Sequence, residues 1–344
     1  MTIGAFDGVH LGHRRLIERV RRTATDIGAV ATVVTFDRHP ASVVRPDSAP
    51  LLLTDLDQKL ALLEACGVDL TVVVHFDGER AAERAEDFVG EVLVGCLNAR
   101  AVIVGHDFHF GHNREGDVPL LQRMGAQMGF DVTGIRLLGT GGAASSGATA
   151  SGATTSGAGN SGANTSGANT SGAPDSAAVA GGAELLSGSE PISSTRIRRL
   201  ISEGDVARAA ALLGRWYELR GLVGHGEKRG RELGFPTANL EVSKEMQICA
   251  DGVYAGWYLR PDGTRHQTAI SIGRQPTFYE SRPYSLIEAH LLDFQGDLYD
   301  EVGTVELVAR LRGQEKFASV EALIDQMSSD VAQTRRTLAT RSPQ

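Results

Sequence analysis

The sequence has little cysteine, no long apolar run and no excess of positive charge. Its three cysteines, Cys66, Cys96 and Cys249, are too few and too scattered for a disulfide framework or a zinc site. No apolar stretch reaches the ~18–20 residues that cross a bilayer, and the first residues, MTIGAFDGVH, lack the basic and apolar regions of a secretion signal. A net charge of -8 argues against general binding of nucleic acid, although a local basic cluster can still hold a nucleotide. These absences predict a soluble, cytoplasmic protein without a membrane or nucleic-acid partner.

Glycine is abundant, and its excess is partly local. Of the 41 glycines, 12 lie in 139–183, where Ser-Gly-Ala recurs every five residues from Ser146 to Ser171. Almost no side chain there is large enough to pack, so we expect a disordered insertion. A solenoid of five-residue units is the competing interpretation, but the tract has no regular apolar position. Because 344 residues are about twice the usual ~150-residue domain, the sequence predicts two domains, and the insertion falls within the first of them.

The first 138 residues alternate between strand and helix patterns, which predicts a Rossmann-like parallel α/β sheet whose ligands bind at the carboxyl ends of the strands. Runs such as TVVVHF and AVIVG are apolar throughout, as in strands covered on both faces. The first strand starts at the second residue, so we expect it to be short. In the second helix, Thr54 is the predicted cap and Gly67 the predicted stop. The predicted strands are 2–5, 29–35, 70–76, 101–105 and 131–135, and the predicted helices are 12–25, 55–66, 85–97 and 118–128.

After the tract, two short helix patterns precede a series of strand patterns. No long helix interrupts 216–312, which predicts a small antiparallel β-barrel. A terminal helix places Leu323, Met327, Val331 and Leu338 near one face. The short helices are predicted at 194–202 and 206–213, the strands at 217–223, 253–260, 265–272, 285–292 and 302–311, and the last helix at 320–338.

Two segments carry groups that bind phosphate. Residues 4–13, GAFDGVHLGH, place two imidazoles and free backbone N–H groups at a helix start, where the helix dipole favours an anion. Metal binding is a rival, but no third ligand lies at a useful spacing. Residues 192–198, ISSTRIR, crowd hydroxyls, amides and a guanidinium into another helix start, which suits a triphosphate. Taken singly, each segment also fits a surface loop or an ordinary capped helix with solvated arginines.

Together these segments resemble the HxGH and SSTxxR elements of the nucleotidylyltransferase superfamily, which attacks the α-phosphate of a nucleotide and releases pyrophosphate. The resemblance implies catalytic positioning and charge stabilisation by His10, His13, Ser194 and Arg198. It also implies that ATP contacts Gly4, Phe6, Asp7, Gly8, His10, Gly12, His13, Ser193, Ser194, Thr195 and Arg198.

Two further segments narrow the resemblance. Residues 35–40, TFDRHP, and 105–111, GHDFHFG, are similar to segments of prokaryotic FAD synthetases. Phe108 and Phe110 fit either ordinary packing or an apolar wall for a flat isoalloxazine ring. The flavin contacts that this resemblance implies are Asp37, His39, Asp107, Phe108, Phe110 and Arg114.

The most specific stretch is 221–240, GLVGHGEKRGRELGFPTANL, which resembles the ATP-binding segment of riboflavin kinases and matches neither P-loop nor protein-kinase spacing. The resemblance implies that Thr237 and Asn239 hold Mg²⁺ and that Glu288 is the general base. A bare glutamate on a strand would otherwise be a solvated side chain. Ser271 replaces an asparagine that is common in the family. The implied ATP contacts are Gly226, Lys228, Gly230, Arg231, Gly234, Phe235, Pro236, Thr237 and Asn239.

The whole pattern resembles the bifunctional riboflavin kinase/FMN adenylyltransferase family. It implies an adenylyltransferase domain over 1–205 and a kinase domain over 206–340, with ATP as co-substrate, Mg²⁺ as cofactor, and FMN and FAD as product ligands. Riboflavin, FMN and ATP are then the partners, and a weak homo-oligomer is left open. The alternatives are an adenylyltransferase for another acceptor, a non-enzymatic flavin-binding regulator, and a riboflavin kinase with an impaired adenylyltransferase domain.

Overall fold

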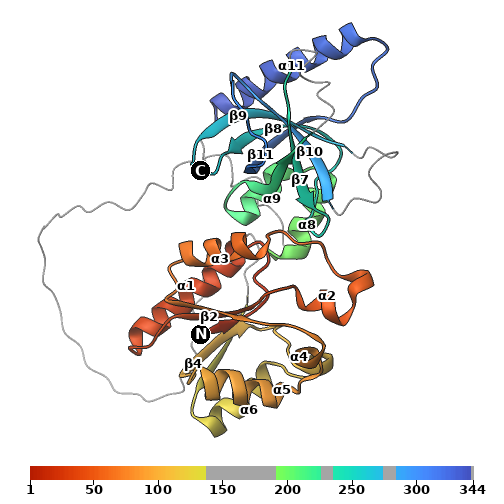
Figure 1. The fold of residues 1–344 in the computed structure, drawn as a ribbon. Helices are drawn as coiled ribbons and strands as arrows, with labels where there is room; N and C mark the ends of the chain where they lie inside the picture. The colour runs from red at the N-terminus through yellow and green to blue at the C-terminus, as the bar shows by residue number, and fades with distance from the viewer. Residues whose placement is uncertain (137–190, 226–234, 274–283, 342–344) are drawn as a thin grey trace, which may run out of the picture.

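The computed structural model describes residues 1–136, 191–225, 235–273 and 284–341. It consists of an α/β lobe and a β-barrel, with two short helices, α8 and α9, lying between them (Figure 1). The predicted insertion at 139–183 lies outside the described residues. Within the described residues, every helix is too short or too polar to pass through a bilayer.

The α/β lobe contains the predicted parallel sheet. Its paired strands run in the order β3-β2-β1 and β4-β5, and all pairs are parallel. Met1 joins the two groups, since its amino group donates to Ala101 O at 2.7 Å and its carbonyl accepts from Ile103 N at 2.9 Å. The combined strand order is therefore β3-β2-β1-β4-β5, so the strand order switches between β1 and β4. Ligands of such sheets bind at this switch point, at the carboxyl ends of the strands. The strands are β1 (Thr2–Ile3), β2 (Thr32–Phe36), β3 (Leu70–Val74), β4 (Ala101–Gly105) and β5 (Asp131–Ile135).

Helices cover both faces of this sheet because successive strand residues point to opposite sides. Val33 and Ile103 pack with α1 and α3, whereas Val34, Val102 and Val104 pack with the helices of the other face. The helix predicted over 85–97 starts as an α-helix and continues with π-helical hydrogen bonds. The main helices are α1 (Leu11–Asp26), α3 (Leu56–Ala65), α5 (Ala85–Phe88), the π-helical η2 (Val89–Cys96) and α6 (Val118–Met128). Short elements that the patterns did not predict are α2 (Pro40–Val44), η1 (Pro46–Ser48), α4 (Gly78–Ala82) and η3 (His112–Arg114).

Two predictions about this lobe were wrong in detail. Strand β3 is not covered on both faces: Leu70 and Val73 are 44% and 39% exposed, because β3 is an edge strand of the sheet. The cap of α3 is Asp55, which forms a reciprocal capping box with Gln58. Thr54 is occupied elsewhere, as its hydroxyl accepts a hydrogen bond from Gly8 N at 3.1 Å.

The second lobe is a closed antiparallel barrel with strand order β10-β7-β6-β11-β8-β9, as predicted. Strand β7 was not predicted, because its first residues belong to the glycine-rich segment 221–240, which was interpreted as a binding loop. Apolar side chains fill the interior, and residues that alternate with them along a strand, such as Asn239, Ser271 and Glu288, face outward. The strands are β6 (Tyr217–Gly224), β7 (Ala238–Ser243), β8 (Gly252–Leu259), β9 (Arg265–Ile272), β10 (Tyr284–Leu291) and β11 (Val302–Arg312).

Helix α11 (Val320–Ala339) packs on the outside of the barrel (Figure 1). Its inner face carries the four predicted apolar residues, of which Leu338 is fully buried, and also the buried Asp330. Asp330 accepts two hydrogen bonds from the Arg312 guanidinium, at 2.7 and 3.0 Å to its two oxygens. This charged pair fixes the register of the helix against β11.

Helices α8 (Ser194–Glu203) and α9 (Val206–Leu213) share one hydrophobic core with the barrel. Leu53 of the α/β lobe belongs to the same core. Next to it, Leu52 forms a β-bridge with Met246 of the barrel lobe. The segment that contains Leu52 and Leu53 therefore ties the two lobes together.

A buried carboxyl group on the barrel predicts a pH-dependent stability. Glu306 is 3% exposed, and Arg265 bonds only one of its oxygens, at 3.1 Å. Burial, with a further contribution from Glu218, raises the pKa of Glu306 to about 7. Because the folded-state pKa lies above the unfolded one, this group's contribution to stability is present below about pH 4.5 and is lost as the pH rises through 7.

We expect Glu306→Gln to remove a pH-dependent loss of about 3 kcal/mol in the free energy of unfolding between pH 4.5 and 8. Urea unfolding at several pH values measures this, with the exposed Glu315→Gln as the matched control. An unchanged pH dependence in Glu306→Gln would show that the carboxyl group does not titrate as its burial requires.

Candidate active sites

The loop that follows β1 presents two histidines at the start of α1. His10 caps the helix, and its Nδ1 accepts a hydrogen bond from His13 N at 3.3 Å. The two rings stack with centroids 3.6 Å apart. Gly12 allows this arrangement, because a Cβ atom there would lie 3.1 Å from the His10 ring. Since Nδ1 of His10 is an acceptor, a neutral ring carries its proton on Nε2.

Both imidazoles are neutral near pH 7. Burial, with the nearby charges of Arg215 and Arg198, lowers the pKa of His10 to about 4. Burial and the proximity of His10 also lower the pKa of His13 well below its usual range. The two rings therefore offer neutral N–H donors at this helix start. The resemblance implied that His10 and His13 stabilise negative charge. As neutral rings they can do so by donating hydrogen bonds but not by carrying a positive charge.

Asp7 joins this loop to the start of α8. Its buried carboxylate accepts hydrogen bonds from the backbone N–H groups of Leu53 and Thr54 at 2.9 and 3.1 Å, and from Arg198 Nη2 at 2.5 Å. The Ser194 hydroxyl donates to the Asp7 carbonyl at 2.9 Å. Two sequence motifs separated by more than 180 residues are thus in direct contact. Arg198 is directed at Asp7 here, and its Nε donates to Leu51 O at 2.6 Å.

The remaining predicted ATP contacts surround this core. Gly4 extends the pairing with β2 by donating to Val34 O at 3.0 Å. Phe6 packs edge-on against His13 with centroids 5.1 Å apart. Ser193 caps α8 by accepting from Arg196 N, and Thr195 is exposed on the first turn of that helix.

The predicted flavin contacts lie on the loops after β2 and β4. Phe108 and Phe110 stack with centroids 5.4 Å apart and remain partly exposed. His39 caps α2 through Nδ1, which accepts from Ala41 N at 3.1 Å. Asp37 accepts from Phe76 N at 3.0 Å. Both loops leave carboxyl ends of strands that flank β1, so they border the same crevice. Asp107 and Arg114 are exposed at its rim.

Two residues at this edge of the sheet were missed by the sequence analysis. Lys59 of α3 is 7% exposed, and its ammonium donates to Phe36 O at 2.7 Å. Burial lowers its pKa, while Asp7 and Asp37 act in the opposite direction. His75, after β3, contacts Asp37 Oδ2 at 2.7 Å. The available signal for Lys59 was a charged residue on the buried face of α3, four residues before the buried Leu63. Nothing in the local sequence distinguishes His75.

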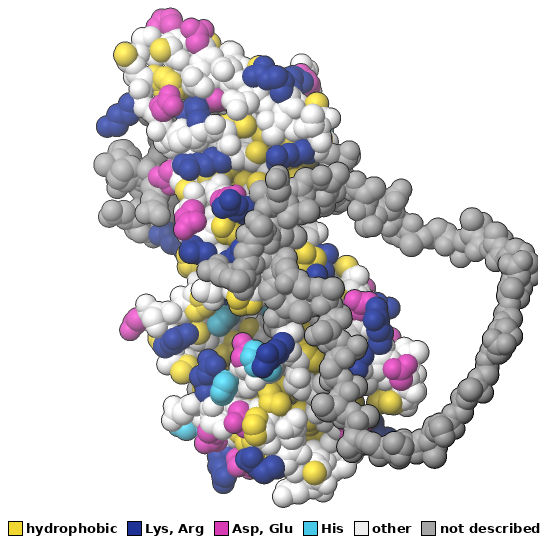
Figure 2. Space-filling model, turned by 180° about the vertical axis from the view of Figure 1, so that it is seen from behind, with side chains coloured by type: hydrophobic (Ala, Val, Ile, Leu, Met, Phe, Trp, Pro, Cys, Tyr) yellow, Lys and Arg dark blue, Asp and Glu magenta, His cyan; other side chains and the backbone are white. Residues whose placement is uncertain are grey.

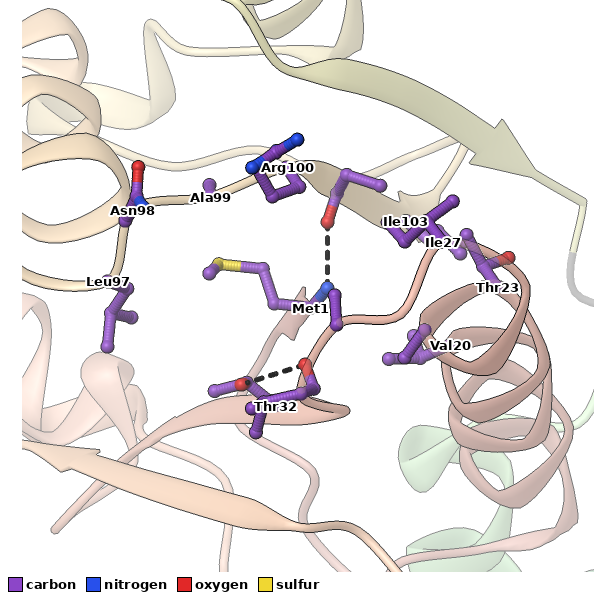
Figure 3. A pocket seen from close by; sticks show the side chains of 14 residues that line it. Met1, Val20, Thr23, Ile27, Thr32, Leu97, Asn98, Ala99, Arg100 and Ile103 are labelled. Atoms are coloured by element: carbon purple, nitrogen blue, oxygen red, sulfur yellow. Dashed lines mark hydrogen bonds between the residues drawn. The ribbon is translucent and has the colours of Figure 1, made fainter.

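The distribution of histidines agrees with a site on the α/β lobe. Seven of the ten histidines fall within the first 112 residues. Histidine side chains gather beside basic, acidic and apolar ones on the α/β lobe when the molecule is seen from behind (Figure 2). A cavity of about 170 Å³, lined by Met1, Val20, Thr32, Leu97 and Ile103 among others, lies instead at the amino ends of the strands (Figure 3). It is therefore at the opposite end of the sheet from the two histidines.

A second constellation lies on the outer surface of the barrel. Glu288 of β10 is directly opposite Asn239 of β7 on one side and Ser271 of β9 on the other. Side chains of such cross-strand neighbours share a face and have Cβ atoms ~5 Å apart. Gln314 donates to the Ser271 hydroxyl at 3.2 Å and to Ile272 O at 3.1 Å. The register thus brings together the predicted base, Glu288, and one predicted metal ligand, Asn239.

The segment before β7 is held against β10. His290 Nδ1 donates to Pro236 O at 2.8 Å, and the His290 and Phe235 rings meet edge to face at 5.4 Å. Thr237 lies directly before β7, two residues from Asn239, and both residues are partly exposed. Five predicted ATP contacts lie outside the described residues: Gly226, Lys228, Gly230, Arg231 and Gly234.

The two lobes together define a class of protein: a two-part chain with a parallel α/β lobe and a closed antiparallel barrel, each carrying one cluster of the predicted site residues. Comparison with known families gives the same division. The FAD synthetase profile matches residues 1–148, and the riboflavin kinase profile matches residues 213–338. The chain belongs to the bifunctional riboflavin kinase/FMN adenylyltransferase family, which confirms the resemblance seen in the sequence.

Relatives cover nearly the whole chain. A bifunctional riboflavin kinase/FMN adenylyltransferase of Escherichia coli K12 is 32% identical over 330 residues, which are 96% of this chain and 90% of the relative. The proteins of the same description from Pseudomonas fluorescens and Listeria monocytogenes are each 33% identical, over 97% of this chain and 91% of theirs. A crystal structure described as a macrolide-efflux protein from Streptococcus pneumoniae superposes with a TM-score of 0.74 at 26% identity. It covers 97% of this chain and 93% of its own.

Proposed function

We propose that this chain makes FAD from riboflavin in two steps. The barrel phosphorylates riboflavin with ATP to give FMN and ADP, and the α/β lobe joins FMN to the AMP portion of ATP with release of pyrophosphate. The observation that carries this proposal is that each lobe matches one of the two family profiles and holds its own cluster of the residues predicted for that reaction.

In the kinase step, Glu288 acts as the general base. A primary alcohol is a poor nucleophile, and a carboxylate within hydrogen-bond reach can take its proton as the new bond to the γ-phosphorus forms. The position of Glu288 between Asn239 and Ser271 supports this role, because both neighbours come from fixed strands of the barrel. Thr237 and Asn239 bind the phosphates of ATP on the same face.

The donor set near Glu288 suits Mg²⁺, since a hydroxyl, an amide oxygen and a carboxylate are the hard oxygen ligands that this ion prefers. Thr237 and Asn239 would hold the ion. When bound, Mg²⁺ offsets the negative charge of the phosphates that the two residues orient. No cluster of three or more His, Cys, Asp or Glu side chains suited to a metal occurs among the residues that the structure describes. Amide and hydroxyl ligands together with ATP oxygens are therefore the proposed coordination.

In the adenylyltransferase step, the FMN phosphate is already an anionic nucleophile, so positioning and charge stabilisation supply the catalysis. His10 and His13 donate N–H groups to the phosphates at the start of α1, where the helix dipole also favours negative charge. Ser194 and Arg198 keep the Asp7 segment in place beside them. Phe108 and Phe110 form an apolar wall for the flavin ring, with Asp37, His39, Asp107 and Arg114 as the surrounding polar contacts.

The proposed boundaries are 1–205 for the adenylyltransferase domain and 206–340 for the kinase domain. The core of α8 continues into the barrel, so the two units share packing on both sides of residue 205. We propose the cytoplasm as the location, which the three free thiols support.

Purified protein incubated with riboflavin, ATP and Mg²⁺ tests the proposed function, with flavins separated by chromatography. The expected result is FMN followed by FAD. FMN without FAD would indicate a riboflavin kinase with an impaired adenylyltransferase domain, and no new flavin would indicate a flavin-binding regulator. Either result would overturn the two-step function.

Lys59 provides a test at the flavin side of the first site. Its buried ammonium lies at the carboxyl end of β2, between Asp7 and Asp37, where a flavin phosphate would approach. Loss of a charge-assisted hydrogen bond of about 1.5–3 kcal/mol predicts at least a ~10-fold lower kcat/KM for FMN in Lys59→Met. FMN titrations at saturating ATP measure this, with the exposed Lys244→Met as the control. Unchanged kinetics would place Lys59 outside the substrate site.

A further inference from the structure

Three successive carbonyl groups of the loop after β1 are held by side chains. The Asp7 carbonyl accepts from Ser194 Oγ at 2.9 Å, the Gly8 carbonyl from Arg215 Nη1 at 2.8 Å, and the Val9 carbonyl from Arg14 Nε at 3.4 Å. Ser194 was predicted from its motif, and Arg14 belongs to α1 next to the loop. Arg215 lies more than 200 residues away and was not predicted to have any role at this site.

The loop needs such support because its backbone is strained. Phe6, Gly8 and Val9 have φ angles of 49°, 81° and 36°. Positive φ is uncommon for residues with a side chain, and it persists only where the surroundings enforce it. A β-branched residue such as Val9 is especially unfavourable in this region. The contacts of Ser194, Arg215 and Arg14 therefore hold a conformation that the loop would not keep by itself.

Arg215 is itself placed by rigid elements. It lies between the end of α9 and the start of β6, and it is largely buried. Leu213 packs against Gly8: a Cβ atom at Gly8 would lie 3.4 Å from the Leu213 side chain. Gly214 packs more closely still against Leu11 of α1, where a Cβ atom would lie 2.6 Å from the Leu11 side chain. The backbone directly before Arg215 is thus packed against the loop after β1 and the start of α1.

We propose that Arg215 is a positioning residue of the adenylyltransferase site, supplied by the part of the chain that matches the riboflavin kinase profile. Its guanidinium fixes the peptide plane between Gly8 and Val9 and so sets the loop geometry that His10 and His13 need to meet the nucleotide phosphates. This inference rests on the proposed function of the α/β lobe. It means that the first site is completed by a residue from beyond the FAD synthetase match, which ends at 148.

Two variants of the full-length protein test this proposal. Arg215→Met removes the donor and is expected to lower kcat/KM for ATP in the conversion of FMN to FAD by about 10- to 100-fold, which is the range for loss of a charged hydrogen bond. Arg215→Lys keeps a cationic donor and is expected to recover most of that loss. The KM for FMN should stay near the wild-type value in both variants, since the predicted flavin contacts lie on other loops.

The conversion of riboflavin to FMN, measured in the same preparations, shows whether the barrel has folded. Arg208→Met is the matched control, because Arg208 is an exposed arginine of α9. Wild-type kcat/KM for ATP in Arg215→Met would overturn the inference while leaving the proposed function intact. Equal loss of both activities in the Met and Lys variants would also overturn it, by indicating a purely structural role. If the wild-type protein makes no FAD from FMN, the proposed function fails and the inference fails with it.

Discussion

Replacement of Glu288 by glutamine is expected to reduce the conversion of riboflavin to FMN by about 10²- to 10⁴-fold, the range observed when a general base is removed. Glutamine keeps the size of the side chain and its place opposite Asn239 and Ser271, so the barrel register should survive. The loss should appear in kcat, because the proton is transferred in the transition state. Steady-state rates at saturating riboflavin and ATP measure it.

The same variant carries its own control. When FMN is supplied, Glu288→Gln should form FAD at the wild-type rate, since none of the residues assigned to that step lies on β10 or on its neighbours β7 and β9. Glu321→Gln, at an exposed position on α11, controls for the loss of one carboxylate. A kcat for FMN formation within a few-fold of wild type would remove Glu288 from the role of base.

Arg198→Met is expected to combine a loss of stability with a loss of FAD synthesis. Arg198 and Asp7 form a pair whose side chains are 12% and 6% exposed, so removal of the cation leaves a buried carboxylate without its charge partner. Breaking such a pair costs about 3–5 kcal/mol in the free energy of unfolding. The loop that carries His10 should also shift, and we expect FAD formation from FMN to fall by about 10²-fold or more.

A double variant separates these two effects. In Asp7→Asn combined with Arg198→Met, both charges of the buried pair are removed together, while Asn can still accept hydrogen bonds from Leu53 N and Thr54 N. We expect it to regain much of the lost stability in urea unfolding but not FAD synthesis. If the double variant were no more stable than Arg198→Met, the ion pair would not be the source of the loss.

The elements that the sequence predicted well are those with a strong local pattern. Strands β4 and β5 and helices α6 and α9 have the predicted bounds, because apolar runs and capping residues mark their ends. The cap of α3 was misplaced by one residue, since Thr54 and Asp55 are both good capping residues. Only the tertiary structure shows that Thr54 bonds to Gly8 and is not available to the helix.

Site residues, like the caps, could be predicted only where a local pattern marks them. Motifs predicted His10, His13, Ser194 and Glu288 because each lies in a segment with a family pattern. Lys59 and Arg215 donate to backbone carbonyl groups of Phe36 and Gly8 from a helix and from the connection between α9 and β6, and neither lies in a segment with a family pattern. Their roles depend on which carbonyl groups lie within reach after folding, and a sequence pattern does not encode that distance. The direction of Arg198 toward Asp7 likewise became visible only in three dimensions.

The central proposal is that one polypeptide contains two separate sites that act in succession. Mixing Glu288→Gln with the Asp7→Asn/Arg198→Met variant, and following flavins over time from riboflavin, ATP and Mg²⁺, tests it most directly. Glu288→Gln alone should convert riboflavin at least ~100-fold more slowly than the wild type. The double variant alone should stop at FMN, and the mixture should produce FAD through FMN released into solution. FAD from riboflavin at the wild-type rate with either preparation alone, or none from the mixture, would contradict the account.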